Sequence, residues 1–283
     1  MREWRKDMNT DVKLFVADID NTLRGKNRRI PGPLTISAIQ EMHQRGIIVG
    51  IASGRPLWQE VSTHYRDWDL GFQFDFLIGM NGGELWTKKN DTKETFHLLS
   101  VDTLKEIVLT MKDLPDTNPF VYGDGFELSR YADDEMAASG KRHNTEIRIA
   151  QDDSDLWRKP TGKILYRCGT PENGEKVEKF GQKAFGSRIS CFRTAPSLVE
   201  LQDPQNNKGV ALKHFCEHSD IDLKNVIAFG DAENDIAMLQ AAGWSVCLKN
   251  GMDDVKAIAD DITAYPCDED GVGHYLWKHV LTQ

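Results

Sequence analysis

The chain has 283 residues, with 35 Lys and Arg against 44 Asp and Glu, and a formal net charge of −9. This length allows one large domain or two ordinary ones, and 40% hydrophobic residues supply enough material for a buried core. The acidic balance argues against a nucleic-acid-binding protein, which needs an excess of basic residues or a basic face.

The cysteines and the apolar runs bear on the cellular compartment. Five cysteines are scattered along the chain without a CxxC pair, so they indicate reduced thiols rather than a zinc site or a disulfide framework. The N-terminal segment lacks the apolar run of a signal peptide, and runs such as residues 46–52 are too short to span a membrane. We therefore expect a cytoplasmic protein that does not bind membranes.

The N-terminal third is predicted to alternate strands and helices. The apolar run at 12–17 predicts a buried strand, and periodic apolar residues after the break at 31–33 predict a helix that ends at Gly46. A second strand at 46–52 ends at Ser53, a helix is expected from Pro56, and residues 75–79 predict a third strand. This order indicates an α/β sheet with right-handed crossovers.

The segment from 85 to 202 interrupts this alternation. Its patterns predict a strand at 94–100, an amphipathic helix at 104–114 and a hairpin at 120–129. A strand at 163–168, a helix at 172–184 and two closing strands at 189–192 and 197–201 follow. We therefore expect an inserted α+β domain at 85–202, with an antiparallel sheet covered by helices on one face.

The alternation returns near the C-terminus, so the first domain is expected to be discontinuous, comprising 1–84 and 203–283. Residues 225–230 predict a strand that ends at Asp231, and a helix from about Asn234 stops at Gly243. A short strand at 245–248 follows, and two helical patterns at 255–259 and 272–281 close the chain.

Polar residues follow three of the predicted strands. Asp18, Ser53 and Asp231 each lie at the carboxyl end of a strand, where ligands bind in open α/β sheets. Taken singly, each residue also fits a turn or a helix cap, but together they favour a common site. Hard oxygen ligands of this kind suit Mg²⁺, so the sequence predicts a metal-assisted site.

Four motifs extend this prediction to a family. DIDNTL at 18–23, SGR at 53–55, NKG at 207–209 and GDAENDIAML at 230–239 occur in an order that resembles the haloacid dehalogenase (HAD) superfamily. The chain looks most like its Cof-like, subclass IIB sugar phosphatases, and GMNGGELW at 79–86 resembles their hinge into the cap. The resemblance implies a Rossmann-like core with a central parallel sheet, and an α/β cap for substrate specificity between the second and third motifs.

The resemblance also implies a reaction: Mg²⁺-dependent hydrolysis of small phosphorylated metabolites, sugar phosphates in particular, through an aspartyl phosphate. Asp18 would be the nucleophile and Asp20 the general acid and base. Ser53 and Lys208 would hold the phosphoryl oxygens, with backbone N–H groups around Asn21 and Gly54. The predicted metal ligands are Asp18, Asp20 through its backbone carbonyl, Asp231, Asn234 and Asp235.

Some alternatives stay open. A phosphotransferase or mutase acting on sugar phosphates would need the same two carboxylates, and a non-catalytic phosphosugar-binding regulator would keep the pocket alone. Asn21 stands where these phosphatases usually have Gly, and Asn tolerates the unusual backbone angles of such a loop better than most residues. The expected ligand is a small phosphate ester, and the expected assembly is a monomer or a homodimer.

Overall fold

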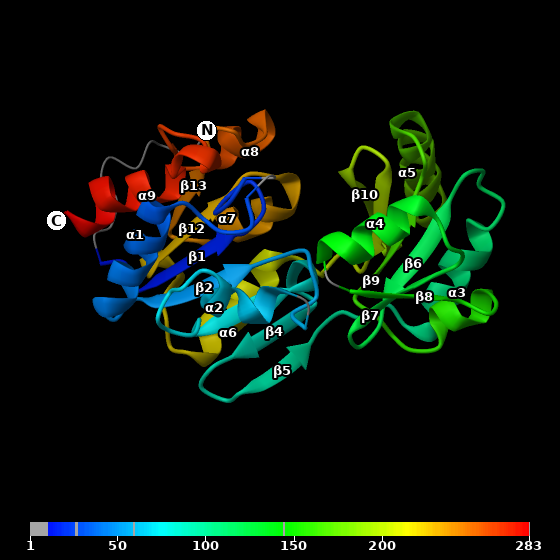
Figure 1. Ribbon diagram of the computed structural model, residues 1–283, viewed down its shortest axis with the longest axis horizontal. Coiled ribbons are helices and arrows are strands. Elements are labelled where there is room, and N and C mark those ends of the chain that lie inside the picture. Colours follow the sequence, from blue (N-terminus) through cyan, green and yellow to red (C-terminus); the bar gives the residue numbers. More distant parts are fainter. Residues whose placement is uncertain (1–10, 26–27, 59, 144, 283) are drawn as a thin grey trace. The chain divides into compact units, whose positions relative to one another are not determined.

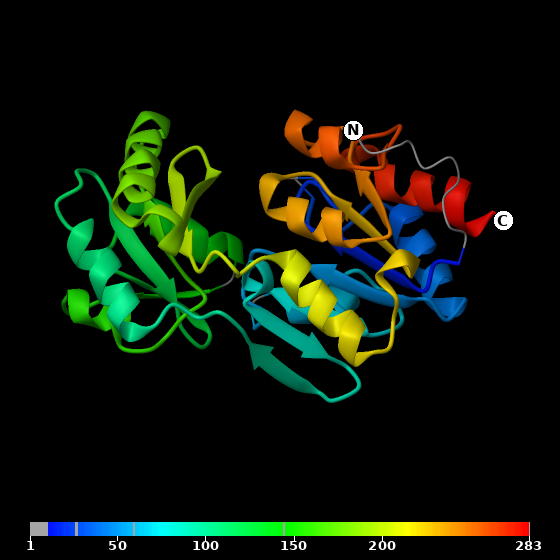
Figure 2. The same ribbon diagram turned by 180° about the vertical axis from the view of Figure 1, so that it is seen from behind.

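The computed structural model describes residues 11–25, 28–58, 60–143 and 145–282. It divides into two compact units, each with its own sheet (Figures 1 and 2). Unit 1 comprises the described residues of Met1–Leu57, Val61–Glu94 and Asn207–Gln283, and unit 2 those of Trp58–Glu60 and Thr95–Asn206. Residues 85–94, which were expected in the inserted domain, belong to unit 1, and the assignment of a core and a cap stays a prediction.

Unit 1 is built on an eight-stranded sheet of order β14-β13-β12-β1-β2-β3-β4-β5. The pairs from β14 to β3 are parallel, and β4 is antiparallel to β3. The strands are β1 (Leu14–Asp18), β2 (Ile48–Ala52), β3 (Phe76–Gly79), β4 (Glu84–Thr87), β5 (Thr92–Thr95), β12 (Val226–Gly230), β13 (Trp244–Cys247) and β14 (Asp261–Ile262). This arrangement confirms the predicted α/β fold with a central parallel sheet.

Helices cover both faces of this sheet. On one face α1 and α9 pack together and share a core with Phe15, Val49 and Phe229. On the other face α6 and α7 pack together, as Figure 2 shows from behind, and Phe215 of α6 stacks on Phe76 of β3 at 4.0 Å between ring centroids. The helices are α1 (Pro33–Gln44), α2 (His64–Asp67), α6 (Lys208–His218), α7 (Ile236–Ala241), α8 (Asp253–Ile258) and α9 (Gly271–Leu276).

The helix expected from Pro56 is wrong in extent. The structure has only a 3₁₀ turn at Glu60–Thr63 and the short α2. The backbone groups just before this turn form tertiary hydrogen bonds. The N–H of Leu57 donates to Glu84 at 2.8 Å, and the carbonyl oxygen of Arg55 accepts from the N–H of Met80 at 2.9 Å. These tertiary bonds hold the chain in bends and a turn where a helix would begin, and a periodicity argument could not detect them.

Unit 2 contains a six-stranded sheet of order β10-β11-β9-β6-β7-β8. All of its pairs are antiparallel except β7 with β8. The strands are β6 (Asn118–Tyr122), β7 (Phe126–Ser129), β8 (Glu146–Ile149), β9 (Lys163–Arg167), β10 (Ser190–Ala195) and β11 (Leu198–Gln202). The predicted strand at 94–100 is wrong, because only Thr92–Thr95 is extended and it pairs in unit 1.

Both faces of the unit 2 sheet carry helices, which corrects the prediction of one covered face. Helices α3 (Val101–Thr110) and α5 (Pro171–Phe185) pack on one face, and α4 (Asp134–His143) lies on the other. Helix α4 escaped prediction because Met136 is its one large apolar side chain in the cluster with Phe120 and Leu165. No helix among the described residues is long and apolar enough to cross a membrane.

Candidate active site

Three buried carboxylates meet at the carboxyl edge of the unit 1 sheet. Asp18 ends β1, Asp231 follows β12, and Asp235 lies in the 3₁₀ turn that leads into α7. Because β1 and β12 are adjacent and parallel, their ends meet, and one oxygen from each of the three carboxylates lies within 4.8 Å of the others. The structure thus brings together one acidic residue of the first motif and two of the fourth.

Lys208 joins this cluster from the first turn of α6. Its Nζ donates to Asp18 Oδ1 at 2.5 Å and to Asp235 Oδ1 at 2.7 Å, and the side chain is fully buried. The neighbouring Gly209 explains the position, because a Cβ there would lie 2.3 Å from the carbonyl oxygen of Ala237 in α7. Only glycine lets the two helices approach closely enough for Lys208 to reach both carboxylates.

Asp235 and Asp231 are held by further hydrogen bonds. Asp235 Oδ2 accepts from the backbone N–H of Asp231 at 2.9 Å and from that of Ala232 at 3.1 Å. Thr22, in the loop after β1, donates its hydroxyl to Asp231 Oδ1 at 2.7 Å. Asp235 therefore orients both Lys208 and the loop that carries Asp231.

The charges in this cluster do not balance, since three carboxylates face one ammonium. Burial raises the pKa of Asp18 well above its ordinary value, outweighing the nearby ammonium, and burial followed by the charge of Asp235 raises the pKa of Asp231 to about 7. Burial alone would lower the pKa of Lys208, but Asp18 and Asp235 outweigh it and raise that pKa. Lys208 stays charged, and when all three carboxyl groups are ionised the site carries an excess of negative charge that a cation would neutralise.

The donor set fits a magnesium ion. Mg²⁺ prefers oxygen ligands and binds through a few carboxylates while it keeps several waters. Asp18 and Asp231 supply such oxygens at the edge of the sheet, and a bound cation would favour the ionised form of both carboxyl groups. Asp235 is already bound to Lys208 and to two backbone N–H groups, so its place is around the metal site rather than at its centre.

Asp20 lies outside the buried cluster, and its side chain is 44% exposed. Arg24 contacts its Oδ1, with Nε at 3.3 Å and Nη2 at 3.2 Å. Arg55 contacts its Oδ2, with Nη2 at 2.9 Å. A half-exposed carboxyl group beside the nucleophile position matches the place expected of a general acid.

The remaining predicted residues surround the cluster. Ser53 is buried at the end of β2, and its hydroxyl accepts from the N–H of Arg55 at 3.1 Å. A Cβ on Gly54 would lie 3.0 Å from Asn81 Oδ1, which also accepts from Asn234 Nδ2 at 3.1 Å. Asn21 has φ 66°, the left-handed conformation that its side chain tolerates. The side chain of Asn234 is thus held by Asn81.

The family follows from a comparison of the whole sequence. A family model for haloacid dehalogenase-like hydrolases matches residues 15–276. This chain belongs to the haloacid dehalogenase-like hydrolase family. The predicted superfamily is therefore confirmed, over a span that contains all four motifs, all of unit 2 and most of unit 1.

Several HAD relatives align over nearly the full length. The 5-amino-6-(5-phospho-D-ribitylamino)uracil phosphatase YitU of Bacillus subtilis is 25% identical, over 96% of this chain and 99% of that protein. The HMP-PP phosphatase of Yersinia enterocolitica is 28% identical, over 95% and 96% of the two chains. The solved structure of the HAD subclass IIB sugar phosphatase BT4131 matches with a TM-score of 0.80 and 21% identity, over 94% and 98%, which shows the shared fold.

Sequence reasoning missed four residues of this HAD site: Thr22, Arg24, Arg55 and Asn81. Asn81 is buried with φ 57°, between Met80 at φ 51° and Gly82 at φ 114°. Three successive left-handed residues are rare, and the Asn-Gly step was a turn signal in the sequence. Arg55 stood inside the SGR motif, whereas Arg24 had no signal beyond its place in the loop.

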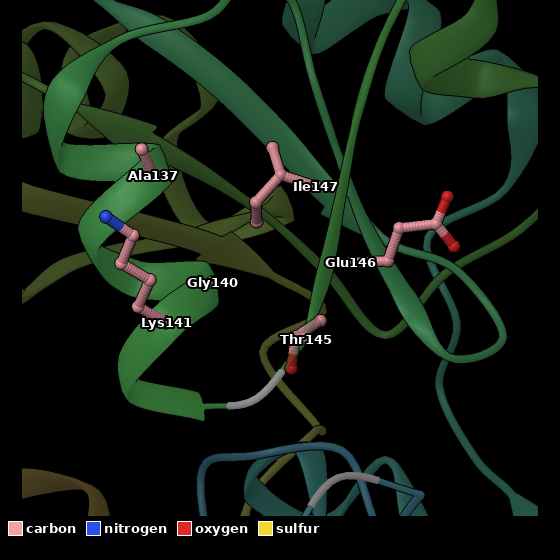
Figure 3. Close-up of a pocket in the computed structure, with 6 residues that line it drawn as sticks. All are labelled: Ala137, Gly140, Lys141, Thr145, Glu146 and Ile147. Atoms are coloured by element: carbon pink, nitrogen blue, oxygen red, sulfur yellow. The ribbon is translucent and has the colours of Figure 1, made fainter.

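A cavity of about 420 Å³ lies in unit 2, between α4 and β8 (Figure 3). Gly140 brings the helix close to the strand, since a Cβ there would lie 2.7 Å from Ile147. Ile147 points toward α4, whereas Glu146 points away from it. None of the predicted site residues lines this cavity, so it is not the predicted active site.

Proposed function

We propose that this protein is a Mg²⁺-dependent phosphatase of small phosphate esters, sugar phosphates in particular, that works through an aspartyl phosphate on Asp18. The observation that carries the proposal is the buried cluster of Asp18, Asp231 and Asp235 around Lys208. Relatives that align over nearly the whole chain are named phosphatases, which supports the reaction class. The substrates in their names differ, so the natural substrate of this chain is proposed only as a class.

In the first step, a carboxylate oxygen of Asp18 forms a bond to phosphorus while the bond to the leaving oxygen breaks. Asp20 gives its proton to that oxygen, so the product leaves as an alcohol. In the second step water attacks the same phosphorus, Asp20 takes the proton, and inorganic phosphate leaves Asp18. Lys208 and Ser53 stabilise the charge on the phosphoryl oxygens in both steps.

Bound Mg²⁺ would offset the repulsion between the Asp18 carboxylate and the phosphate and would orient the phosphoryl group. Asp18, the Asp20 backbone carbonyl and Asp231 are the proposed ligands, with Asn234 and Asp235 supporting them. We assign substrate specificity to the inserted segment 85–202, as the resemblance implies. A cap of this kind would contact the leaving group and exclude water from the reaction.

The test is phosphate release from an aryl phosphate by the unmodified protein with Mg²⁺, with a chelator, and by Asp18→Asn. We expect turnover to need the metal and to fall by about 10³-fold or more in the variant, because the nucleophile is lost. Asp253→Asn is the matched control, since that carboxylate is 98% exposed.

Three outcomes would contradict the proposal. Full activity in Asp18→Asn would exclude the aspartyl phosphate. Binding of a phosphosugar without phosphate release under any metal condition would favour the non-catalytic regulator, whereas transfer of the phosphoryl group to an added sugar in place of water would favour the phosphotransferase.

A further inference from the structure

Both oxygens of the Asp20 carboxylate are held, each by a different guanidinium group. Arg24 contacts Oδ1 through two nitrogens, Nε at 3.3 Å and Nη2 at 3.2 Å, and Arg55 contacts Oδ2 at 2.9 Å. The two arginines come from different loops, one after β1 and one after β2. The carboxyl group of Asp20 is therefore contacted by a guanidinium group on each side, although the Asp20 side chain is 44% exposed.

Arg24 is more firmly fixed than the group it holds. Its side chain is only 7% exposed, and its Nη1 donates to the carbonyl oxygen of Arg29 at 2.6 Å. Its backbone N–H donates to Ile19, and its carbonyl oxygen accepts from Asn21 at 2.7 Å. The planar guanidinium group of Arg24 is held by Arg29 on one side and presents two nitrogens to Asp20 on the other. A flexible lysine side chain would not offer this fixed geometry.

Burial of this guanidinium needs a reason. Taking a cation out of water is costly unless it is paired, and an apolar side chain would fill a buried loop position with less loss. The partner here is half exposed, so the pair adds little to stability by itself. The observation that remains is geometric: Arg24 and Arg55 set the rotation of the Asp20 carboxyl group.

We propose that Arg24 is a positioning residue for Asp20, and that it orients the carboxyl group for proton transfer to the leaving oxygen. The inference rests on the proposed function. The terminal torsion of an aspartate is broad and roughly two-fold, so a carboxyl group without these contacts would adopt a wider range of orientations. A general acid contributes about 10²–10⁴-fold, and a misplacement near 1 Å can remove about 10²-fold.

The proton transfer can be isolated by the choice of leaving group. In the first step the Asp18–phosphorus bond forms, the bond to the aryl oxygen breaks, and the Asp20 proton moves to that oxygen. A phenolate needs this proton, whereas a 2,4-dinitrophenolate leaves well without it. The ratio kcat/KM covers substrate binding and this first step, and it leaves out hydrolysis of the aspartyl phosphate, which comes later.

The experiment compares phenyl, 4-nitrophenyl and 2,4-dinitrophenyl phosphate in the unmodified protein and in Arg24→Met, with Mg²⁺ present. We expect Arg24→Met to lower kcat/KM about 10- to 100-fold for phenyl phosphate and less than about 3-fold for the dinitrophenyl ester. Arg24→Lys keeps the positive charge but not the planar guanidinium group, so its loss in kcat/KM should lie between those of Arg24→Met and the unmodified protein. Arg28→Met is the matched control, because Arg28 is an exposed residue of the same loop, and it should match the unmodified protein.

A double-mutant cycle with Asp20→Asn sharpens the test. If Arg24 acts through Asp20, Arg24→Met should add no leaving-group dependence once Asp20 is replaced. An equal loss for all three esters would overturn the inference and leave a structural role.

Failure of the proposed function has a different signature. It would appear as activity retained in Asp18→Asn, or as no turnover of any ester by the unmodified protein. Melting temperatures of all variants show whether each is folded. If Arg24→Met is not folded, Arg24→Lys is compared with the unmodified protein instead. Its loss in kcat/KM should again be larger for phenyl phosphate than for the dinitrophenyl ester.

Discussion

The two sheets bury charge in different places. In the parallel sheet of unit 1, Asp18 and Asp231 lie at the ends of neighbouring strands, and Lys208 reaches them from a helix. In the largely antiparallel sheet of unit 2, Lys163 of β9 and Glu200 of β11 form a buried ion pair at 2.9 Å on one face of the sheet. The first arrangement follows from strand direction, and the second from strand register.

This difference decides what each charge can do. Strand ends in a parallel sheet are open to a ligand, so an excess of carboxylates there can serve a metal and a phosphate. Lys163 and Glu200 are diagonal neighbours, since Glu200 is paired with Leu165 and Lys163 with Gln202. The side chains of Lys163 and Glu200 come from neighbouring strands of one sheet, and their opposite charges pair with each other.

The largest expected effect comes from removing the lysine of each cluster. Lys208→Met and Lys163→Met each leave a buried carboxylate without its ammonium, so each should destabilise its unit by about 3–5 kcal/mol. Mg²⁺ should reduce the loss in Lys208→Met, because a cation bound near Asp18 replaces the missing charge. The loss in Lys163→Met should not depend on Mg²⁺.

Calorimetric melting with Mg²⁺ and with a chelator measures both losses. Hydrogen exchange of β12 and β11 assigns each transition to unit 1 or unit 2. An equal Mg²⁺ effect on the two variants would remove the distinction between an open cluster and a closed pair.

The next effect concerns acid sensitivity of unit 1. Burial, followed by the charges of Arg24 and Arg55, lowers the pKa of His64 to about 3, and its ring stacks on Trp68 at 4.7 Å. An unfolded histidine takes up its proton near pH 6.5, so the stabilising contribution is complete above that pH and is lost as the pH falls toward 3. At pH 5.5 the loss should be about 1.4 kcal/mol.

His64→Phe keeps the stacking and removes the titration, so its unit 1 transition should fall less between pH 8 and pH 5.5 than that of the unmodified protein. The exposed His218→Gln serves as the control and should keep the original dependence. If His64→Phe and the unmodified protein lose the same stability, the buried histidine is not responsible.

The smallest effect concerns left-handed loop residues in the two units. Asn21 in unit 1 has φ 66°, and Asp116 in unit 2 has φ 50°. Replacement by Ala should cost about 1 kcal/mol relative to replacement by Gly at both positions, because a Cβ is disfavoured there. Only the unit 1 position should affect activity, with Asn21→Gly active and Asn21→Ala impaired.

Melting temperatures and phosphate release measure these four variants. Loss of activity in Asn21→Gly would show that the Asn side chain itself is needed. Loss of activity in Asp116→Ala at unchanged folding would contradict the assignment of that loop to structure alone.

Much of unit 1 was predictable because its signals are local. Apolar runs predicted β1, β2, β3 and β12, and the polar residues after them predicted where the cluster would form. The rule that parallel strands place their carboxyl ends at one edge turned separate residues into one site. The helix from Pro56 failed because tertiary hydrogen bonds to Glu84 and Met80 override a local pattern.

The sequence by itself determined the α/β alternation, the four motifs and the meeting of Asp18 with Asp231, since these depend on periodicity and on strand direction. Only the tertiary structure decided that Arg24 grips Asp20 and that Lys163 meets Glu200. The reason is that such contacts depend on loop conformation and strand register. A shift of one residue in register would move a side chain to the opposite face, and composition carries no record of it.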